Sequence, residues 1–296
     1  MRNNKIDIVT LGCSKNLVDS ERLLKRFKDL GYSVAHDSEN ISGDVVVVNT
    51  CGFIGDAKEE SINYILELVE AKAEGRIQQL YVMGCLSERY GDELKQEIPE
   101  VDKFYGKFDW TQVIEDLGNN YPPTQSYERV VTTPKHYSYL KISEGCNRFC
   151  AFCAIPLITG RHTSISIEEL VKEVEYMVSM GVKEFNLIAQ DLSSYGLDLY
   201  KKQMLPELVD AIAQVEGVEW IRLHYAYPSQ FPMELLPVMR KHSKVCKYID
   251  IALQHISDNV LRNMRRHINK VETMELLAKI RAEVPEIHIS KEGISA

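Results

Sequence analysis

Blocks of apolar and polar residues alternate along the first third of the chain, as in buried strands followed by amphipathic helices. The strand-like runs, rich in Val and Ile, are residues 6–11, 44–49 and 79–83. The helical patterns are residues 19–30 and 57–73 and a short segment after the third run. Continuous apolar runs that alternate with helices are typical of a parallel sheet with both faces covered. The pattern predicts an N-terminal α/β domain over residues 1–118.

The alternation stops at a turn-rich stretch that contains Pro122 and Pro123, and then it resumes. We predict an inter-domain linker at residues 119–137. The strands predicted beyond it are residues 137–142, 184–189, 219–225, 248–253 and 287–289. The helices predicted between them are residues 167–180, 205–215, 233–242 and 258–283. Repeated βα units predict a parallel barrel or partial barrel over residues 138–296, and five strands leave that barrel incomplete.

Three cysteines occupy equivalent positions in the strand–helix pattern of the N-terminal domain. Cys13, Cys51 and Cys85 each follow a predicted strand directly. Because parallel strands end at one edge of a sheet, where open α/β sheets bind ligands, we expect the three thiols to converge. A single cysteine there would be interpreted as a small buried hydrophobe. Three in equivalent positions favour a binding site.

Three further cysteines lie close together after the first strand of the second domain. Cys146, Cys150 and Cys153 have the spacing C-x3-C-x2-C. Three thiolates on one loop favour a [4Fe–4S] cluster whose fourth iron is open. Zinc is the main alternative, with His162 as a possible fourth ligand. Unligated thiols are a weaker alternative, because exposed cysteines on one loop are reactive.

Composition narrows the function classes without identifying one. The 296 residues are 45% hydrophobic, too apolar for a disordered chain, and 35 basic against 43 acidic residues give a net charge of −8. Such a chain has no global attraction for nucleic acid. Seven cysteines, an odd number, argue against a disulfide framework. Cys246, near the start of a strand, is interpreted as buried and inert. No apolar run spans a membrane, and the polar N-terminus is unlike a signal peptide, so we expect a cytoplasmic protein.

The cysteine loop resembles that of the radical S-adenosylmethionine enzymes. The resemblance rests on the C-x3-C-x2-C spacing and on the aromatic Phe152 before the last cysteine. It implies that Cys146, Cys150 and Cys153 hold a [4Fe–4S] cluster, whose open iron binds S-adenosylmethionine. The cofactor is then cleaved to a 5′-deoxyadenosyl radical. It also implies that the βα units form that family's partial barrel.

The N-terminal domain extends the resemblance to the methylthiotransferases of that superfamily. Residues 11–16 (LGCSKN), 49–54 (NTCGFI) and 83–86 (MGCL) match the motifs of that family. The match implies that Cys13, Cys51 and Cys85 hold a second, auxiliary [4Fe–4S] cluster that carries the sulfur to be inserted. Two S-adenosylmethionine molecules are used, one as methyl donor and one as radical source.

Four segments resemble the RimO branch of this family. They are residues 139–146 (YLKISEGC), 153–156 (CAIP), 190–196 (QDLSSYG) and 250–258 (DIALQHISD). This branch methylthiolates the β-carbon of an aspartate in the small-subunit ribosomal protein S-twelve. The alternatives are the MiaB branch, which modifies tRNA adenosine, and a non-catalytic zinc-binding module. The resemblance implies no membrane partner, a flavodoxin or ferredoxin as electron donor, and a monomer.

Other candidate residues follow from the same resemblance and from their places at strand ends. Phe152 is expected to contact adenine, with simple packing as an equal alternative. Ser143 and Glu144 are expected near the methionyl amino group. Gln190 and Asp191 end the second barrel strand, at the functional face.

Three more positions carry weaker expectations. Arg161 is expected to meet a carboxylate or to be a solvated surface residue. His255 either lines the pocket or is a core histidine. The basic run at residues 262–267 is interpreted as a solvated helix end or as a patch for an acidic partner.

The family pattern continues beyond the point where this chain stops matching, at residue 289. A sixth barrel strand, a glycine-rich turn and a C-terminal TRAM β-barrel are expected in full-length members. We therefore expect a C-terminally truncated chain, whose own activity stays open. An incomplete barrel would leave a strand edge uncovered.

Overall fold

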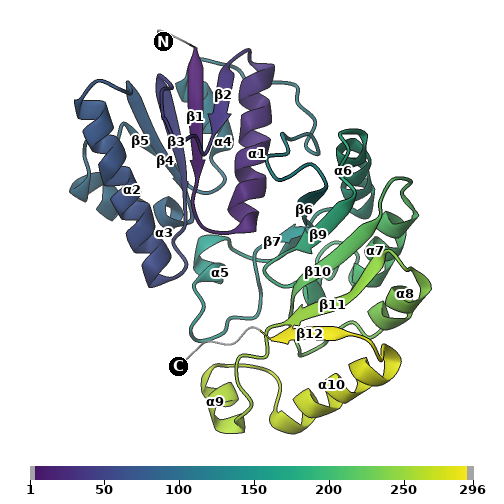
Figure 1. The fold of residues 1–296 in the computed structure, drawn as a ribbon. Helices are drawn as coiled ribbons and strands as arrows, with labels where there is room; N and C mark the ends of the chain where they lie inside the picture. The colour runs from purple at the N-terminus through teal and green to yellow at the C-terminus, as the bar shows by residue number, and fades with distance from the viewer. Residues whose placement is uncertain (1–3, 292–296) are drawn as a thin grey trace. The chain divides into compact units, whose positions relative to one another are not determined.

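A computed structural model describes residues 4–291; residues 1–3, part of the polar N-terminus considered above, and 292–296 lie outside this range. The chain divides into two compact units. Unit 1 comprises residues 1–132 and Leu157–Thr159, and unit 2 comprises Thr133–Pro156 and residues 160–296 (Figure 1). Both units are built around parallel sheets with helices between the strands, so the predicted α/β fold class is confirmed. Within the described residues, no helix is both long and apolar enough to cross a bilayer.

Unit 1 is a three-layer α/β/α structure. Its sheet has the order β2-β1-β3-β4-β5, and all neighbours are parallel. The strands are β1 (Lys5–Thr10), β2 (Ser33–His36), β3 (Val45–Thr50), β4 (Gln79–Gly84) and β5 (Lys103–Phe104). The helices are α1 (Ser14–Asp29), α2 (Gly55–Ala73), α3 (Cys85–Glu97) and α4 (Trp110–Asp116). Helices α1 and α4 pack on one face, and α2 and α3 on the other (Figure 1).

The central strand explains the continuous valine run in the sequence. Val45 and Val47 pack in the cluster formed with α1 and α4, while Val46 and Val48 pack in the cluster formed with α2 and α3. All four are fully buried. A strand covered on both faces needs apolar residues at every position, which removes the polar alternation of a half-exposed strand.

Part of the predicted linker belongs to the body of unit 1. Arg129 and Glu21 of α1 form an ion pair with side chains 0% and 1% exposed. Thr132 donates from its backbone nitrogen to the same carboxylate at 2.7 Å and from its hydroxyl at 2.8 Å. Residues 119–132 are therefore tied to α1, although their composition predicts free chain. The buried Arg129–Glu21 ion pair holds this segment against α1, and such a long-range pair cannot be predicted from amino-acid composition.

Unit 2 contains a sheet of order β12-β11-β10-β9-β6, again with parallel neighbours. Its strands are β6 (Tyr137–Lys141), β9 (Glu184–Ile188), β10 (Trp220–Ala226), β11 (Val245–Ile251) and β12 (His288–Lys291), with a short antiparallel pair β7 (Ser143–Glu144) and β8 (Thr163–Ser164). The helices are α6 (Ile167–Ser179), the 3₁₀ turn η1 (Leu192–Ser194), α7 (Leu205–Gln214), α8 (Leu235–Lys241), α9 (Asp258–Asn263) and α10 (Lys270–Glu283). The residues of the short helix α5 (Ile155–Ile158) are divided between the two units. Helices α6, α7, α8 and α10 lie along one side of the sheet (Figure 1).

The two faces of this sheet differ in chemistry. Leu187, Leu223 and Ile249 are fully buried on the helix-covered face. On the other face, His224 Nδ1 lies 2.6 Å from Asp250 Oδ2, and His224 Nε2 lies 3.2 Å from Asn186 Oδ1. Three adjacent strands thus join polar side chains on this face, as expected for the inner wall of a partial barrel that binds a polar ligand.

Candidate functional site

In unit 1 the three predicted cysteines lie at one edge of the sheet. Cys13 is the N-cap of α1, Cys51 follows β3, and Cys85 is the first residue of α3 after β4. Because β1, β3 and β4 are adjacent and parallel, their carboxyl ends bring the three cysteines together. Cys51 and Cys85 are buried and Cys13 is exposed. We call this set the edge cysteines.

Glycines let these loops approach one another closely. A Cβ on Gly12 would lie 2.9 Å from Cys51 Sγ, and Gly12 also has a φ of +92°. A Cβ on Gly52 would lie 2.7 Å from the carbonyl oxygen of Cys85. Each of the two contacts brings together two of the three cysteine loops, and only glycine leaves room for both.

Asn16 fixes the same edge with hydrogen bonds. Its side-chain nitrogen donates to the carbonyl of Leu11 at 3.0 Å and to that of Thr50 at 3.1 Å. Its Oδ1 accepts from the Cys85 thiol at 3.6 Å. Asn16 is 1% exposed, so water would not readily replace its side chain. Without Asn16, each of these groups would therefore be left without this hydrogen-bond partner.

The electrostatics of the edge cysteines disfavour free thiolates. Burial, opposed by Lys107 and assisted by charge on Cys13 and Cys51, raises the pKa of Cys85 to about 12. Burial also raises the pKa of Cys51. Lys107 is itself buried and pairs with Asp19 at 2.9 Å. A bound cation would remove the mutual repulsion that this arrangement creates.

In unit 2 the C-x3-C-x2-C segment forms a loop after β7. Gly145 has a φ of +78°, and a Cβ there would collide with the carbonyl oxygen of Arg161. The backbone nitrogen of Cys146 donates to Gly160 at 3.3 Å, and that of Cys153 donates to Cys150 at 3.1 Å. The loop is therefore folded by main-chain bonds. We call Cys146, Cys150 and Cys153 the loop cysteines.

The loop cysteines interact with one another as the edge cysteines do. Burial raises the pKa of Cys146 to about 11, and charge on Cys153 adds to the shift. Burial also raises the pKa of Cys153, with a further contribution from Cys150. Cys150 is 9% exposed and is the most enclosed of the three.

Arg266 and Tyr227 contact Cys150, a second arginine, Arg148, packs on the Tyr227 ring, and the sequence patterns did not indicate these contacts. Arg266 Nη1 donates to Cys150 Sγ at 3.5 Å, and the Tyr227 hydroxyl lies 3.9 Å from the same sulfur. The Tyr227 ring has Arg266 Cζ 4.0 Å and Arg148 Cζ 4.2 Å from its centroid. Burial raises the pKa of Tyr227 to about 12, so its hydroxyl stays protonated at neutral pH.

The interpretation of residues 262–267 as a solvated helix end is wrong for Arg266. Arg262 and Arg265 are exposed, but Arg266 is 8% exposed and directed at the cysteine loop. The cause is the turn after α9, in which Arg266 N donates to Leu261 at 2.9 Å and reverses the chain. Neighbouring basic residues can therefore differ in exposure, with some on the surface and others buried.

The residues predicted to bind S-adenosylmethionine fall into a connected group and an open group. The Glu144 carboxylate accepts from Gln190 and pairs with Lys141 at 2.8 Å. Asp191 accepts from Arg148 Nε at 2.7 Å and caps the turn η1, so it positions Arg148. Among the described residues, the buried Ser143 Oγ and Gln190 Oε1 have no hydrogen-bond partner. Two orphaned polar atoms beside Glu144 fit a site for a polar ligand.

The remaining predicted residues have diverse surroundings. Phe152 is 42% exposed on the cysteine loop, and Arg161 is exposed. His162, the possible zinc ligand, is buried with Nε2 3.1 Å from Ser164 Oγ. His255 is exposed, so its interpretation as a core histidine is wrong; it follows β11 in a loop. Cys246 is only half-buried, because it faces the polar side of the sheet near Arg222.

Both cysteine sets have the donor chemistry that an iron–sulfur cluster needs. Each supplies three thiols, and charge on other thiols of the same set contributes to the raised pKa of Cys85 and of Cys146. Within residues 4–291, no three His, Cys, Asp or Glu side chains already stand as the ligands of a metal ion. Ligation would therefore turn the thiol side chains toward a common centre, and metal binding would be coupled to this rearrangement.

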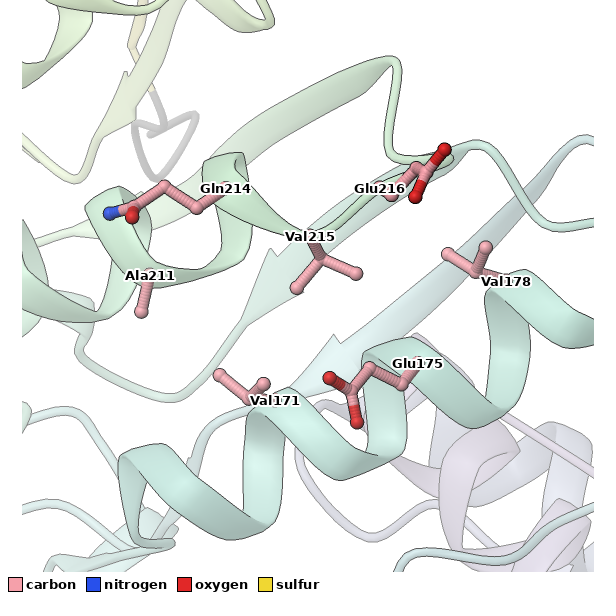
Figure 2. A pocket seen from close by; sticks show the side chains of 7 residues that line it. All are labelled: Val171, Glu175, Val178, Ala211, Gln214, Val215 and Glu216. Carbon is pink, nitrogen blue, oxygen red and sulfur yellow. The ribbon is translucent and has the colours of Figure 1, made fainter.

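A cavity of about 420 Å³ lies between α6 and α7 (Figure 2). Its lining residues are Val171, Glu175, Val178, Ala211, Gln214, Val215 and Glu216. Because β10 begins at Trp220, just after this wall, the cavity lies at the amino-terminal edge of the sheet. The cysteine loop follows strand carboxyl ends, so this cavity is not part of the candidate site.

Comparison with known proteins agrees with both halves of this description. The family model "Uncharacterized protein family UPF0004" matches residues 5–106, and that of the Radical SAM superfamily matches residues 140–290. The chain is 64% identical over 289 residues to a protein of Phocaeicola vulgatus named ribosomal protein uS12 methylthiotransferase RimO. It is 63% identical over 289 residues to the protein of the same name from Bacteroides thetaiotaomicron.

The coverage of these matches is unequal. The aligned part is 98% of this chain but 67% and 66% of the two relatives, so the chain spans about two thirds of their length. Among solved structures, the radical S-adenosylmethionine methyltransferase TsrM from Kitasatospora setae has a TM-score of 0.70 at 13% identity, covering 98% of this chain and 67% of TsrM. At that identity the likeness shows the fold alone.

Proposed function

This chain belongs to the RimO family of ribosomal protein uS12 methylthiotransferases, within the radical SAM superfamily, and we propose that it serves that family's reaction. In this reaction an aspartate of ribosomal protein uS12, the S-twelve protein of the prediction, exchanges a β-carbon hydrogen for a methylthio group. The observation that carries the proposal is the presence of two separate sets of three cysteines, one at the carboxyl ends of the parallel strands β1, β3 and β4 and one on the loop that follows β6 and β7.

The two triads are assigned different roles. The loop cysteines Cys146, Cys150 and Cys153 would hold one [4Fe–4S] cluster, and the edge cysteines would hold a second. When bound, these clusters supply the electron that cleaves S-adenosylmethionine and the site from which sulfur is delivered. The protein's own residues bind the substrates, orient them and exclude water from the reacting carbon.

S-adenosylmethionine is assigned to the polar group beside the cysteine loop. The Glu144 carboxylate would accept hydrogen bonds from the cofactor's amino group, and Gln190 and Ser143 supply the orphaned polar atoms next to it. Phe152 supplies an exposed ring for stacking on adenine, and Arg161 supplies a cation for the carboxylate. Asp191 acts by holding Arg148.

The substrate aspartate is assigned to the polar face of the unit 2 sheet. His224, Asp250 and Asn186 form a hydrogen-bonded row there, and Arg222 beside them pairs with Glu184 at 3.0 Å. A polar face binds an acidic peptide loop through hydrogen bonds and directed charge, whereas an apolar face would not. A ribosomal substrate places the reaction in the cytoplasm.

Electron delivery completes the proposal. One electron is required from outside, for which a flavodoxin or ferredoxin is the donor class, and we propose that the chain works as a monomer. The tRNA-modifying branch stays an outcome of the test, because the net charge of −8 and the names of the relatives favour a protein substrate.

The test counts irons and then identifies the product. After anaerobic reconstitution we expect about eight irons and matching sulfide, falling to about four when Cys146, Cys150 and Cys153 are all replaced by alanine. Zinc without iron would refute the radical assignment. Incubation with S-adenosylmethionine, dithionite and uS12 should then add a methylthio group to one aspartate, detected by peptide mass spectrometry. Methylthioadenosine in tRNA instead would assign the other branch.

A further inference from the structure

The residues around Cys150 form an assembly whose charges do not balance within the protein. Arg148 is neutralised by Asp191 at 2.7 Å and is also bonded to Ser194 at 3.2 Å. Arg266 is different: among the described residues no carboxylate pairs with it. Its Nη2 donates to the carbonyl of Ala252, its Nη1 donates to Cys150, and its buried Nε has no partner within the described part of the chain.

A buried guanidinium without an anion is costly unless one arrives with a ligand. The thiolate of Cys150, as the ligand of a cluster, is the anion nearest to Arg266. The Tyr227 hydroxyl is the second donor near that sulfur. A protein-bound cluster whose sulfur atoms accept hydrogen bonds is easier to reduce, because the donors stabilise the extra negative charge of the reduced cluster.

Two kinds of contact hold the assembly in place. The Tyr227 ring lies between the guanidinium groups of Arg148 and Arg266, which fixes the direction of its hydroxyl. The backbone nitrogen of Ala151 donates to Met264 at 3.1 Å, which ties the cysteine loop to the segment that carries Arg266.

Backbone strain gathers at the same place. Four non-glycine residues within two positions of Cys150, Tyr227, Ala252 or Arg266 have left-handed backbone conformations. They are Phe149, Tyr225, Gln254 and Arg265. Such conformations persist only where the surrounding structure enforces them, and they gather at functional sites.

We propose that Arg266 and Tyr227 are positioning residues that donate to the Cys150 sulfur and raise the reduction potential of the cluster bound by the loop cysteines. Arg148 acts through Tyr227 by fixing its ring. The inference rests on the proposed function, because it requires the loop cysteines to ligate a cluster. The two donors would stabilise the reduced form of a cluster held by the loop cysteines, whose one electron would come from an external reductant.

The test measures the potential of the loop cluster alone. Replacing Cys13, Cys51 and Cys85 by alanine in the full chain removes the edge site, so the remaining cluster signal comes from the loop cysteines. This parent is reconstituted anaerobically, its iron and sulfide are counted, and its reduction by dithionite is followed by electron paramagnetic resonance at controlled potentials. The same measurement is made on Tyr227→Phe, Arg266→Met and Arg266→Lys.

We expect Tyr227→Phe and Arg266→Met each to keep about four irons and to be harder to reduce. At a fixed potential the ratio of reduced to oxidised cluster should fall about tenfold in each, which corresponds to about 59 mV for one electron. Arg266→Lys should lower the potential by less than Arg266→Met does, because lysine keeps a charged donor. Arg262→Met is the matched control: this arginine is exposed on the same segment, and the potential should not move.

The experiment distinguishes a failure of the proposed cluster site from a failure of this inference. A parent chain that binds no iron refutes the proposed cluster site, and this inference with it. Variants that bind four irons at the parent's potential refute the inference alone and leave the proposed function standing. If Arg266→Met binds less iron, Tyr227→Phe and Arg266→Lys decide, and an unchanged potential in Tyr227→Phe overturns the proposal.

Discussion

Replacing Arg129 by methionine should destabilise unit 1 by about 3 kcal/mol. The Arg129 and Glu21 side chains are 0% and 1% exposed, so the variant leaves a carboxylate buried without its cation. Breaking a buried pair from one side costs about 3–5 kcal/mol. We expect the lower end, because two donors from Thr132 still solvate Glu21, each worth about 1 kcal/mol.

Tryptophan fluorescence can assign this loss to unit 1. The chain has two tryptophans, Trp110 in unit 1 and Trp220 in unit 2. Trp220 is 57% exposed, so Trp220→Phe leaves Trp110 as the reporter of unit 1 at little cost. With a slope of about 2 kcal/mol per molar urea, Arg129→Met should lower the unfolding midpoint by about 1.5 M.

The control and the refuting result follow from the same physics. Arg76 pairs with Glu74 on the surface of unit 1, with side chains 56% and 63% exposed, and Arg76→Met should change stability by less than about 0.5 kcal/mol. An Arg129→Met midpoint no lower than that of Arg76→Met would refute the buried-pair argument. The double variant Glu21→Leu with Arg129→Met should be less destabilised than the sum of the single variants, since neither charge is stranded.

Three further outcomes are expected. Gly145→Ala should cut iron uptake by the loop cysteines at least severalfold, measured as iron per chain, because the new Cβ meets a carbonyl oxygen at a left-handed φ. Asn16→Ala should destabilise unit 1 by about 2 kcal/mol in urea, because it strands two buried carbonyls. Lys241 and His242 hold the pKa of Asp210 below its usual range, so this carboxylate stabilises the fold above about pH 4. The contribution is lost as the pH falls through the lowered pKa, so the stability difference between wild type and Asp210→Asn, well under about 1 kcal/mol, should vanish once the pH lies below that pKa.

Hydrophobic periodicity predicted the parallel sheets because their central strands are buried on both faces. The run at residues 44–49 is such a strand, and it appears as β3 with its bounds shifted by one residue. The short edge strand β2 escaped prediction, since its four residues are exposed or half-buried and leave no continuous apolar run. Helix α4 follows a similar rule: seven residues are too few for a clear helical period.

The division of the six cysteines into two sets was predictable, because their signal is local or repeats at equivalent places in a βα pattern. The partners of Cys150 were not, because Tyr227 and Arg266 reach it from distant segments. Contacts that cross the sheet edge depend on loop conformation, such as the turn that directs Arg266 inward. A charge pattern along the chain carries no information about that direction.

The two cysteine sets place different demands on the fold. The loop cysteines lie within one short segment, so the loop needs only its local bonds and the neighbours of Cys150. The edge cysteines come together only when β1, β3 and β4 pair in register. Cys13 caps α1, and Glu21 lies about two turns further along the same helix, so the pair with Arg129 holds the helix that begins at Cys13.

The segment at residues 119–132 therefore affects the edge cysteines indirectly, through its contact with α1. Loss of the Arg129–Glu21 pair acts on α1, and through α1 on the position of Cys13. A ligand that needs all three edge cysteines binds only the folded unit and adds its binding free energy to the stability of that unit. Binding of such a ligand to the edge cysteines would therefore be thermodynamically linked to the stability of unit 1.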